Sequence, residues 1–169
     1  LFYSRRIGRA PQGVADRIPG DAEFSDAPDA SNILGAAKVT GRTHSGWSLG
    51  FMDAVTGREE ARYLDPLSGE RVGTAVEPLT NYGVARVIRS FDQGERALGA
   101  IVTSVHRDLR DDDSLHFLRS AAYAGGVDGR TRFGGGNYEV RGWVLGSAVH
   151  GDSAAVRRTQ RASTPYFQR

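Results

Sequence analysis

The side chains that could carry out chemistry are few, and none of them forms a catalytic pattern. The stretch from Arg110 to Asp113 (RDDD) offers clustered carboxylates that could bind calcium, but it lacks the glycine and terminal glutamate of an EF-hand loop. Glu59 and Glu60 could supply one carboxylate of a glycosidase pair, yet adjacent side chains in a charged segment point apart. We therefore predict that both stretches are solvated loops.

The remaining candidate residues also favour ordinary structural roles. The segment FGGGN (133–137) is a turn rather than a phosphate loop, because no helix follows it. Ser147 lies in no nucleophile-elbow context. The four histidines show no metal-ligand spacing: His44, His106, His116 and His150. We predict no catalytic residue, no metal site and no cofactor; the enzyme question stays open, and this stretch is more typical of a non-enzyme.

One set of charged residues does follow a pattern, because its members fall at alternating positions of extended segments. A midplane arginine facing lipid would cost about 2–4 kcal/mol, whereas one facing water costs little and can pair across strands. The set predicted to face a water-filled lumen is Lys38, Arg42, Arg86, Asp128, Arg130, Arg132, Glu139 and Arg141. Arg5 and Arg6 extend it. Either these charges satisfy one another, or they bind or pass an anionic or polyhydroxyl solute.

The segments that position these charges have a period of two. The predicted strands follow a partial strand at 1–8 and cover 33–43, 46–56, 80–91, 97–107, 120–132 and 138–150. They are longer than the roughly 5–6 residues of a typical strand in soluble domains. The fold class is therefore all-β: an antiparallel up-and-down meander of about six to seven long strands, part of a transmembrane β-barrel and open as this fragment.

The connections alternate in length, which gives a second indication of a barrel. Short turns are predicted at 43–46, 92–96 and 133–137, and long loops at 9–32, 57–77, 108–118 and 151–163. Every long loop then falls at one rim of a single partial barrel domain covering 1–169. Short periplasmic turns and long external loops are typical of bacterial outer-membrane barrels.

Two strands fit this alternation poorly. Segment 46–56 puts Trp47, Leu49 and Phe51 on the same face as Asp53, so we expect a bulge near Met52 or a strand end. Segment 97–107 is fairly apolar at both parities, and its sequence does not orient it.

Composition excludes several classes of protein. The chain has 169 residues and a net charge of only +2, which gives no electrostatic case for nucleic acid. It contains no cysteine, so thiol catalysis and disulfides within it are excluded. No apolar run approaches the roughly 18 residues of a transmembrane helix.

Several blocks in order carry a family resemblance. The segments LFYSRRIGRAP, ILGAAKVTGRT, GWSLGFMDAVT, EPLTNYGVARVIR and LGAIVTSVHRDL, with SAVHGD and the final YFQR, span nearly the whole chain. They resemble the barrel-type domain of unknown function that follows a family-9-like carbohydrate-binding domain in bacterial surface proteins. The resemblance implies that the chain is an internal piece of an outer-membrane β-barrel. It implies no catalytic residues, and it implies a glycan partner only through an N-terminal domain that is missing here.

Two functional classes follow. The favoured one is a segment of a bacterial outer-membrane barrel that acts as a channel, receptor or surface anchor, with the lipid bilayer as its partner. The alternative is a soluble all-β carbohydrate-binding module or part of a periplasmic glycoside hydrolase. That alternative would need a closed two-sheet core and shorter strands.

Overall fold

The computed structural model describes residues 7–22, 24–109 and 113–161 of the chain. Arg5, Arg6 and most of the strand expected at 1–8 lie outside these ranges, as does most of the RDDD stretch. Residues 7 and 8 form part of a turn.

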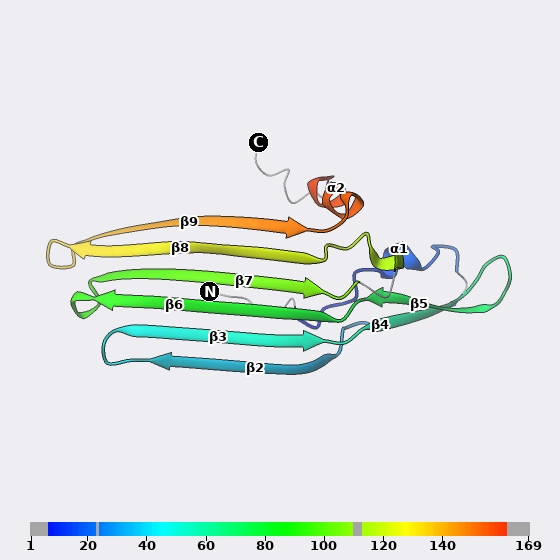
Figure 1. Cartoon of the computed structure of the whole chain (residues 1–169), viewed down its shortest axis with the longest axis horizontal. Coiled ribbons are helices and arrows are strands. Elements are labelled where there is room, and N and C mark those ends of the chain that lie inside the picture. Colours follow the sequence, from blue (N-terminus) through cyan, green and yellow to red (C-terminus); the bar gives the residue numbers. More distant parts are fainter. Residues whose placement is uncertain (1–6, 23, 110–112, 162–169) are drawn as a thin grey trace.

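A six-stranded antiparallel sheet dominates the described structure (Figure 1). Its strands are β2 (Ile33–Arg42), β3 (Trp47–Thr56), β6 (Thr80–Phe91), β7 (Arg96–Arg107), β8 (Ala121–Phe133) and β9 (Tyr138–His150). Their spatial order, β2-β3-β6-β7-β8-β9, is also their order along the chain. The sheet is open, with β2 and β9 at its edges, and no closed barrel is formed by the described residues. The all-β antiparallel prediction is confirmed.

A second, three-stranded sheet was not expected from the sequence. It has the order β1-β4-β5 and is made of β1 (Ser25–Asp26), β4 (Glu59–Leu64) and β5 (Arg71–Glu77). A tight turn joins β4 to β5, in which the Asp65 carboxylate accepts hydrogen bonds from the backbone N–H groups of Leu67 and Ser68. Gly69, with a φ of +68°, ends this turn. The segment 57–77 is therefore largely a hairpin rather than an irregular loop.

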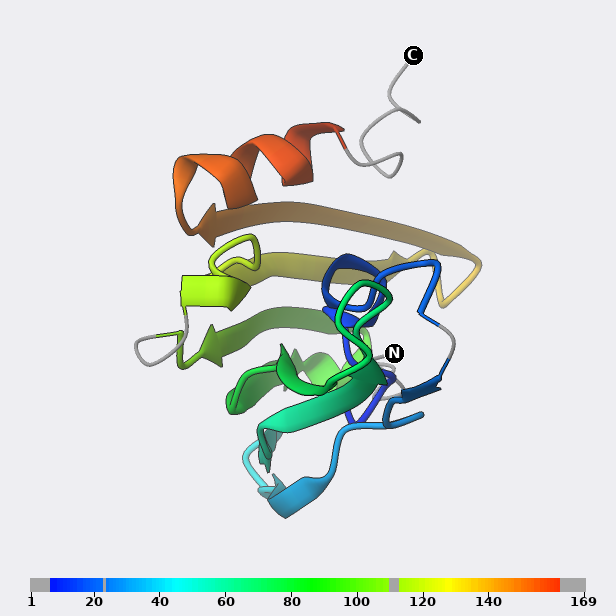
Figure 2. The same ribbon diagram turned by 90° about the vertical axis from the view of Figure 1, so that its right-hand side faces the viewer.

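Short helical elements complete the fold. They are α1 (Val14–Arg17), η1 (Asp92–Gly94), η2 (Asp113–Leu115) and α2 (Ser153–Arg161). Helix α2 lies beyond the β9 edge, at the end of the molecule that carries the long connections (Figure 2). The segment 151–163 is thus helical over most of its length. No helix of the described residues is long and apolar enough to span a membrane.

The short turns depend on glycine. Gly134, Gly135 and Gly136 all have positive φ, so FGGGN is a turn, as predicted. Gly46 has a φ of +86°, and a Cβ there would lie 2.6 Å from the carbonyl oxygen of Ser90. The Ser90 N–H in turn donates to the Gly46 carbonyl, at 2.8 Å. This close approach holds the β2–β3 turn against β6.

Strand register sorts the side chains of the six-stranded sheet into two unlike faces. Directly paired residues share a face, so the row Val39, Phe51, Ala85, Val102, Gly125 and Gly146 belongs to one face. We call it the apolar face, and its exposed large side chains are Val39, Trp47, Leu49, Phe51, Phe91, Leu98, Val102, Tyr123, Val127, Phe133, Tyr138, Val140 and Val144. The opposite side is called the charged face. On that side, the large exposed apolar side chains of the described residues lie on the two edge strands, at the start of β2 (Ile33) and along β9.

The register also resolves the two strands that fitted poorly. Strand β7 presents Val102 to the apolar face and Thr103 to the charged face. No bulge occurs near Met52: β3 pairs regularly on both sides, and Asp53 stays on the apolar face. The β2–β3 irregularity lies instead between Ile33 and Gly35. Asp53 is accommodated because Asn81 Nδ2 donates to its two carboxylate oxygens at 3.0 and 3.1 Å.

The buried apolar residues lie at the end of the sheet that carries the long connections rather than along its length. The described members of this core are Ala54, Ala61, Val76, Leu115, Leu118 and Ala155. Thr56 and Thr80, which pair with each other on the charged face, are fully buried at this end of the sheet. Among the described residues, no second layer packs on either side of the rest of the six-stranded sheet.

Because the core is small and lies at one end, we predict that two leucines differ sharply in how much their substitution by alanine lowers the free energy of unfolding. Leu115 is fully buried next to β5, whereas Leu67 is 98% exposed in the β4–β5 turn. We expect Leu115→Ala to lower the free energy of unfolding of the full-length protein by about 2–5 kcal/mol. The control Leu67→Ala should change it by less than about 0.5 kcal/mol. Denaturant unfolding would measure both, and equal effects would show that this end is not the core.

Candidate functional site

All eight residues predicted to face one side do share the charged face. Arg42 and Asp128 lie in the same register row, Arg130 pairs directly with Arg141, and Arg132 pairs with Glu139. Lys38 and Arg86 have the same parity through their partners on neighbouring strands. The shared side follows from the pairing alone. That it lines a lumen stays a prediction.

The ion pair between Arg86 and Asp128 crosses an intervening strand. Arg86 is on β6 and Asp128 on β8, and the guanidinium reaches the carboxylate over β7. Gly99 of β7 makes this possible, since a Cβ there would lie 2.6 Å from Arg86 Nη2 and 2.9 Å from Asp128 Oδ1. Because Gly99 has no side chain, one salt bridge can pass over β7 and join β6 to β8.

Glu139 is the second carboxylate of the charged face, and two arginines share it. Arg132 Nε donates to Glu139 Oε2 at 2.5 Å, and Arg141 Nε donates to Oε1. Both oxygens of the carboxylate are thus engaged. The trio keeps one formal positive charge.

The other cations of this face have no carboxylate within salt-bridge distance among the described residues. Arg130 donates to the Gly94 carbonyl at 3.1 Å, and its buried Nε has no hydrogen-bond partner among the described groups. Lys38 and Arg42 are exposed on the edge strand β2. With Arg107, which shares this face, the described strands present seven cations here against two carboxylates. The charged face is therefore strongly cationic.

A buried polar network at the long-connection end was missed by the sequence reasoning. Glu77, only 2% exposed, accepts a hydrogen bond from the Gln12 backbone N–H at 2.6 Å. Arg107 Nη1 donates to the Arg119 carbonyl at 3.0 Å, while its buried Nε has no partner among the described groups. No local signal points to Glu77, because its burial depends on a sheet that the sequence did not reveal.

The arginines of this end repel one another. Burial lowers the pKa of Arg119, and the nearby cations Arg9 and Arg158 lower it further. Hydrogen bonds to Asp16 raise the pKa of Arg158. The Arg158 guanidinium donates two hydrogen bonds of 2.8 Å to that carboxylate. This bidentate pair joins α2 to α1.

The carboxylate pair considered for glycoside hydrolysis is not arranged as predicted. Glu60 is exposed, but Glu59 is only 7% exposed, so its assignment to a solvated loop is wrong. The Glu59 side chain accepts a hydrogen bond from the Asn32 backbone N–H at 2.7 Å, which fixes the entry to β2. Its role in this structure is to accept a hydrogen bond from a backbone donor at that point.

The chemistry that this arrangement supports is electrostatic. Within the described ranges no group of three or more His, Cys, Asp or Glu side chains could hold a metal ion. The charged face instead offers fixed guanidinium groups with few counter-charges, an arrangement that binds or guides anions.

Comparison with known proteins gives one match. A family model, described as a domain of unknown function (DUF5916), matches residues 1–116. The chain belongs to this family. No curated protein and no solved structure matches this DUF5916 chain. The matched stretch includes four strands of the six-stranded sheet and all of the three-stranded sheet.

In this DUF5916 chain, a double-mutant cycle can test whether Gly99 is needed for the ion pair between Arg86 and Asp128. Because the Arg86 and Asp128 side chains are 30% and 44% exposed, we expect Arg86→Gln and Asp128→Asn to show a coupling of about 0.5–1 kcal/mol. In a Gly99→Ala background the coupling should fall toward zero, because the new methyl group occupies the path of the ion pair. Gly41→Ala, with open space at its Cβ position, is the matched control. Unchanged coupling in Gly99→Ala would contradict this role.

Proposed function

We propose that this chain is part of a bacterial outer-membrane β-barrel, with its apolar face toward lipid and its charged face toward a water-filled lumen. The barrel serves as a channel, receptor or surface anchor, and a link to glycans through another domain of the same protein follows from the resemblance noted above. The observation that carries the proposal is that two faces of opposite chemistry run along six long strands, and that over most of their length neither face is covered by a second layer of the described residues.

The apolar face supports a lipid environment. Soluble monomers rarely expose contiguous apolar patches larger than a few hundred Å², yet Val39, Val102, Val127 and Val144 are all more than half exposed. Leu98 between them is 62% exposed. A bilayer would cover this surface, and it would leave the arginines of the other face in water.

The ends of the apolar face support the same placement. On β8, Phe133 and Tyr123 flank the apolar stretch and are ten residues apart. At about 3.3 Å per residue this is roughly 33 Å along the strand, or roughly 25 Å of thickness at a tilt of about 40°. That matches the apolar band of outer-membrane barrels, which aromatic girdles flank. Tyr123 also contacts His106 and His150, forming a polar aromatic end to this face.

The open edges support a larger assembly. Strands β2 and β9 each have ten or more residues with one side unpaired in this sheet. In lipid every exposed backbone polar group would cost several kcal/mol, so further strands must pair there to close the wall. A soluble carbohydrate-binding module is less consistent with the fold. It would need a dry core between two sheets, whereas the described core lies at one end.

Fractionation of the full-length protein tests the proposal directly. We expect the protein in the outer-membrane fraction, with an electrophoretic mobility that shifts on boiling, because closed barrels resist detergent until they are heated. Recovery as a soluble periplasmic protein without a heat shift would overturn the proposal, and glycan screening would then be the appropriate assay.

Adjacent substitutions on β7 test which face meets lipid. Val102 lies on the apolar face and Thr103 on the charged face, both in mid-strand. Val102→Arg should reduce the free energy of folding into bilayers by about 2–4 kcal/mol, while Thr103→Arg should be nearly neutral because its guanidinium meets water. Folding into lipid vesicles at graded denaturant would measure both. The reverse order would place the lumen on the other side.

A further inference from the structure

We propose that a hollow on the apolar face binds a phospholipid with an anionic headgroup, the phosphate at Arg89 and an acyl chain along the hollow. This inference rests on the proposed function and names a specific partner for the lipid-facing side. It assigns a role to a cation that is out of place on an apolar face.

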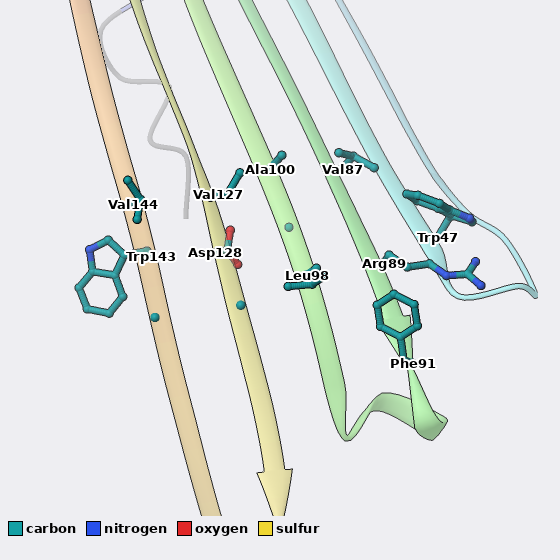
Figure 3. Close-up of a pocket in the computed structure, with 13 residues that line it drawn as sticks. Trp47, Val87, Arg89, Phe91, Leu98, Ala100, Val127, Asp128, Trp143 and Val144 are labelled. Carbon is teal, nitrogen blue, oxygen red and sulfur yellow. The ribbon is translucent and has the colours of Figure 1, made fainter.

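The hollow has a volume of about 970 Å³ and runs across β6, β7, β8 and β9 (Figure 3). Small residues form its floor: Ala100, Gly129 and Gly142 leave space between larger side chains. Val127 and Val144 border it on one side. A second hollow of about 520 Å³ adjoins it and shares Val87 and Ala100, leading to Val39 and Phe51. The two form a continuous apolar track toward mid-strand.

Arg89 lies at the turn end of this track with two aromatic rings. Its guanidinium carbon is 5.1 Å from the Trp47 ring centroid and 5.4 Å from that of Phe91. Figure 3 shows the three side chains gathered at one end of the hollow. No carboxylate of the described residues lies within 4 Å of Arg89. The rings hold the guanidinium by cation–π contacts but leave its positive charge uncompensated.

An uncompensated guanidinium at the end of an apolar track is complementary to one kind of molecule. A phosphate satisfies the charge of Arg89 through charge-assisted hydrogen bonds, and an acyl chain fills the apolar part. From Arg89 to Ala85, at the far hollow, the strand runs roughly 13 Å at about 3.3 Å per residue. This is long enough to seat much of a chain. The short turns beside Arg89 would face the periplasm, which places the site in the leaflet that contains phospholipids.

The chain supplies a matched control in Arg96. Both arginines lie on the apolar face near the short turns, but Arg96 donates to Asp92 in a salt bridge. Its charge is therefore already compensated, and its removal should matter less to a phosphate.

Native mass spectrometry of the purified full-length protein in detergent tests this inference. Dioleoylphosphatidylglycerol and dioleoylphosphatidylcholine would be titrated against the unaltered protein, Arg89→Gln, Arg96→Gln and Ala100→Leu. We expect tighter binding of phosphatidylglycerol to the unaltered protein. Arg89→Gln should weaken that binding roughly fivefold and Arg96→Gln less than about twofold. Ala100→Leu, which fills the floor, should weaken binding of both lipids.

The outcomes separate this inference from the proposed function. Equal affinity for the two lipids, or equal effects of Arg89→Gln and Arg96→Gln, would overturn the lipid site. Heat-shift gels on the same samples report the barrel independently. A protein that shows the heat shift but no preference for phosphatidylglycerol retains the proposed function and loses only this site.

Discussion

The two faces of the six-stranded sheet cannot be placed in one solvent without cost. Exposing the apolar face to water leaves apolar area unburied. Burying the charged face in lipid leaves several guanidinium groups without counter-charge. Packing a second protein layer on either side would satisfy only one of them. A boundary between lipid and water satisfies both, with the sheet itself as the wall. The strand lengths, open edges and end-located core are consistent with that single constraint.

Small residues let the six-stranded sheet carry its charges. Gly99 allows Arg86 and Asp128 to meet across β7, and so the charged face holds an ion pair spanning three strands. On the other face, Gly129 and Gly142 leave a depression rather than a smooth surface. Glycine weakens a strand because it loses more conformational freedom on folding. Gly99, Gly129 and Gly142 are therefore accounted for by packing on the two faces, whereas Gly46 and Gly134–Gly136 serve the short turns.

The long strands were predictable from sequence because each depends on local alternation. Their observed bounds lie within one residue of the predicted ones, and the sorting of charges follows from a period of two. The three-stranded sheet was not predictable, because its short strands are held by contacts with distant segments, such as that of Gln12 with Glu77. The bulge expected near Asp53 was wrong for a related reason, because the side chain that accommodates Asp53, that of Asn81, lies on another strand. Partners distant in sequence leave no periodic trace.

The core at one end of the sheet and the inter-strand hydrogen bonds contribute to stability in different ways. The core buries apolar side chains of β3, β4, β5 and the segment around η2 at one end of the molecule, where β5 contacts η2. Along the rest of the strands, stability depends on inter-strand hydrogen bonds, which contribute little net in water because water competes for the same groups. Lipid removes that competition and makes an unpaired group expensive. A sheet with so little core of its own is therefore best stabilised where its inter-strand hydrogen bonds are shielded from water.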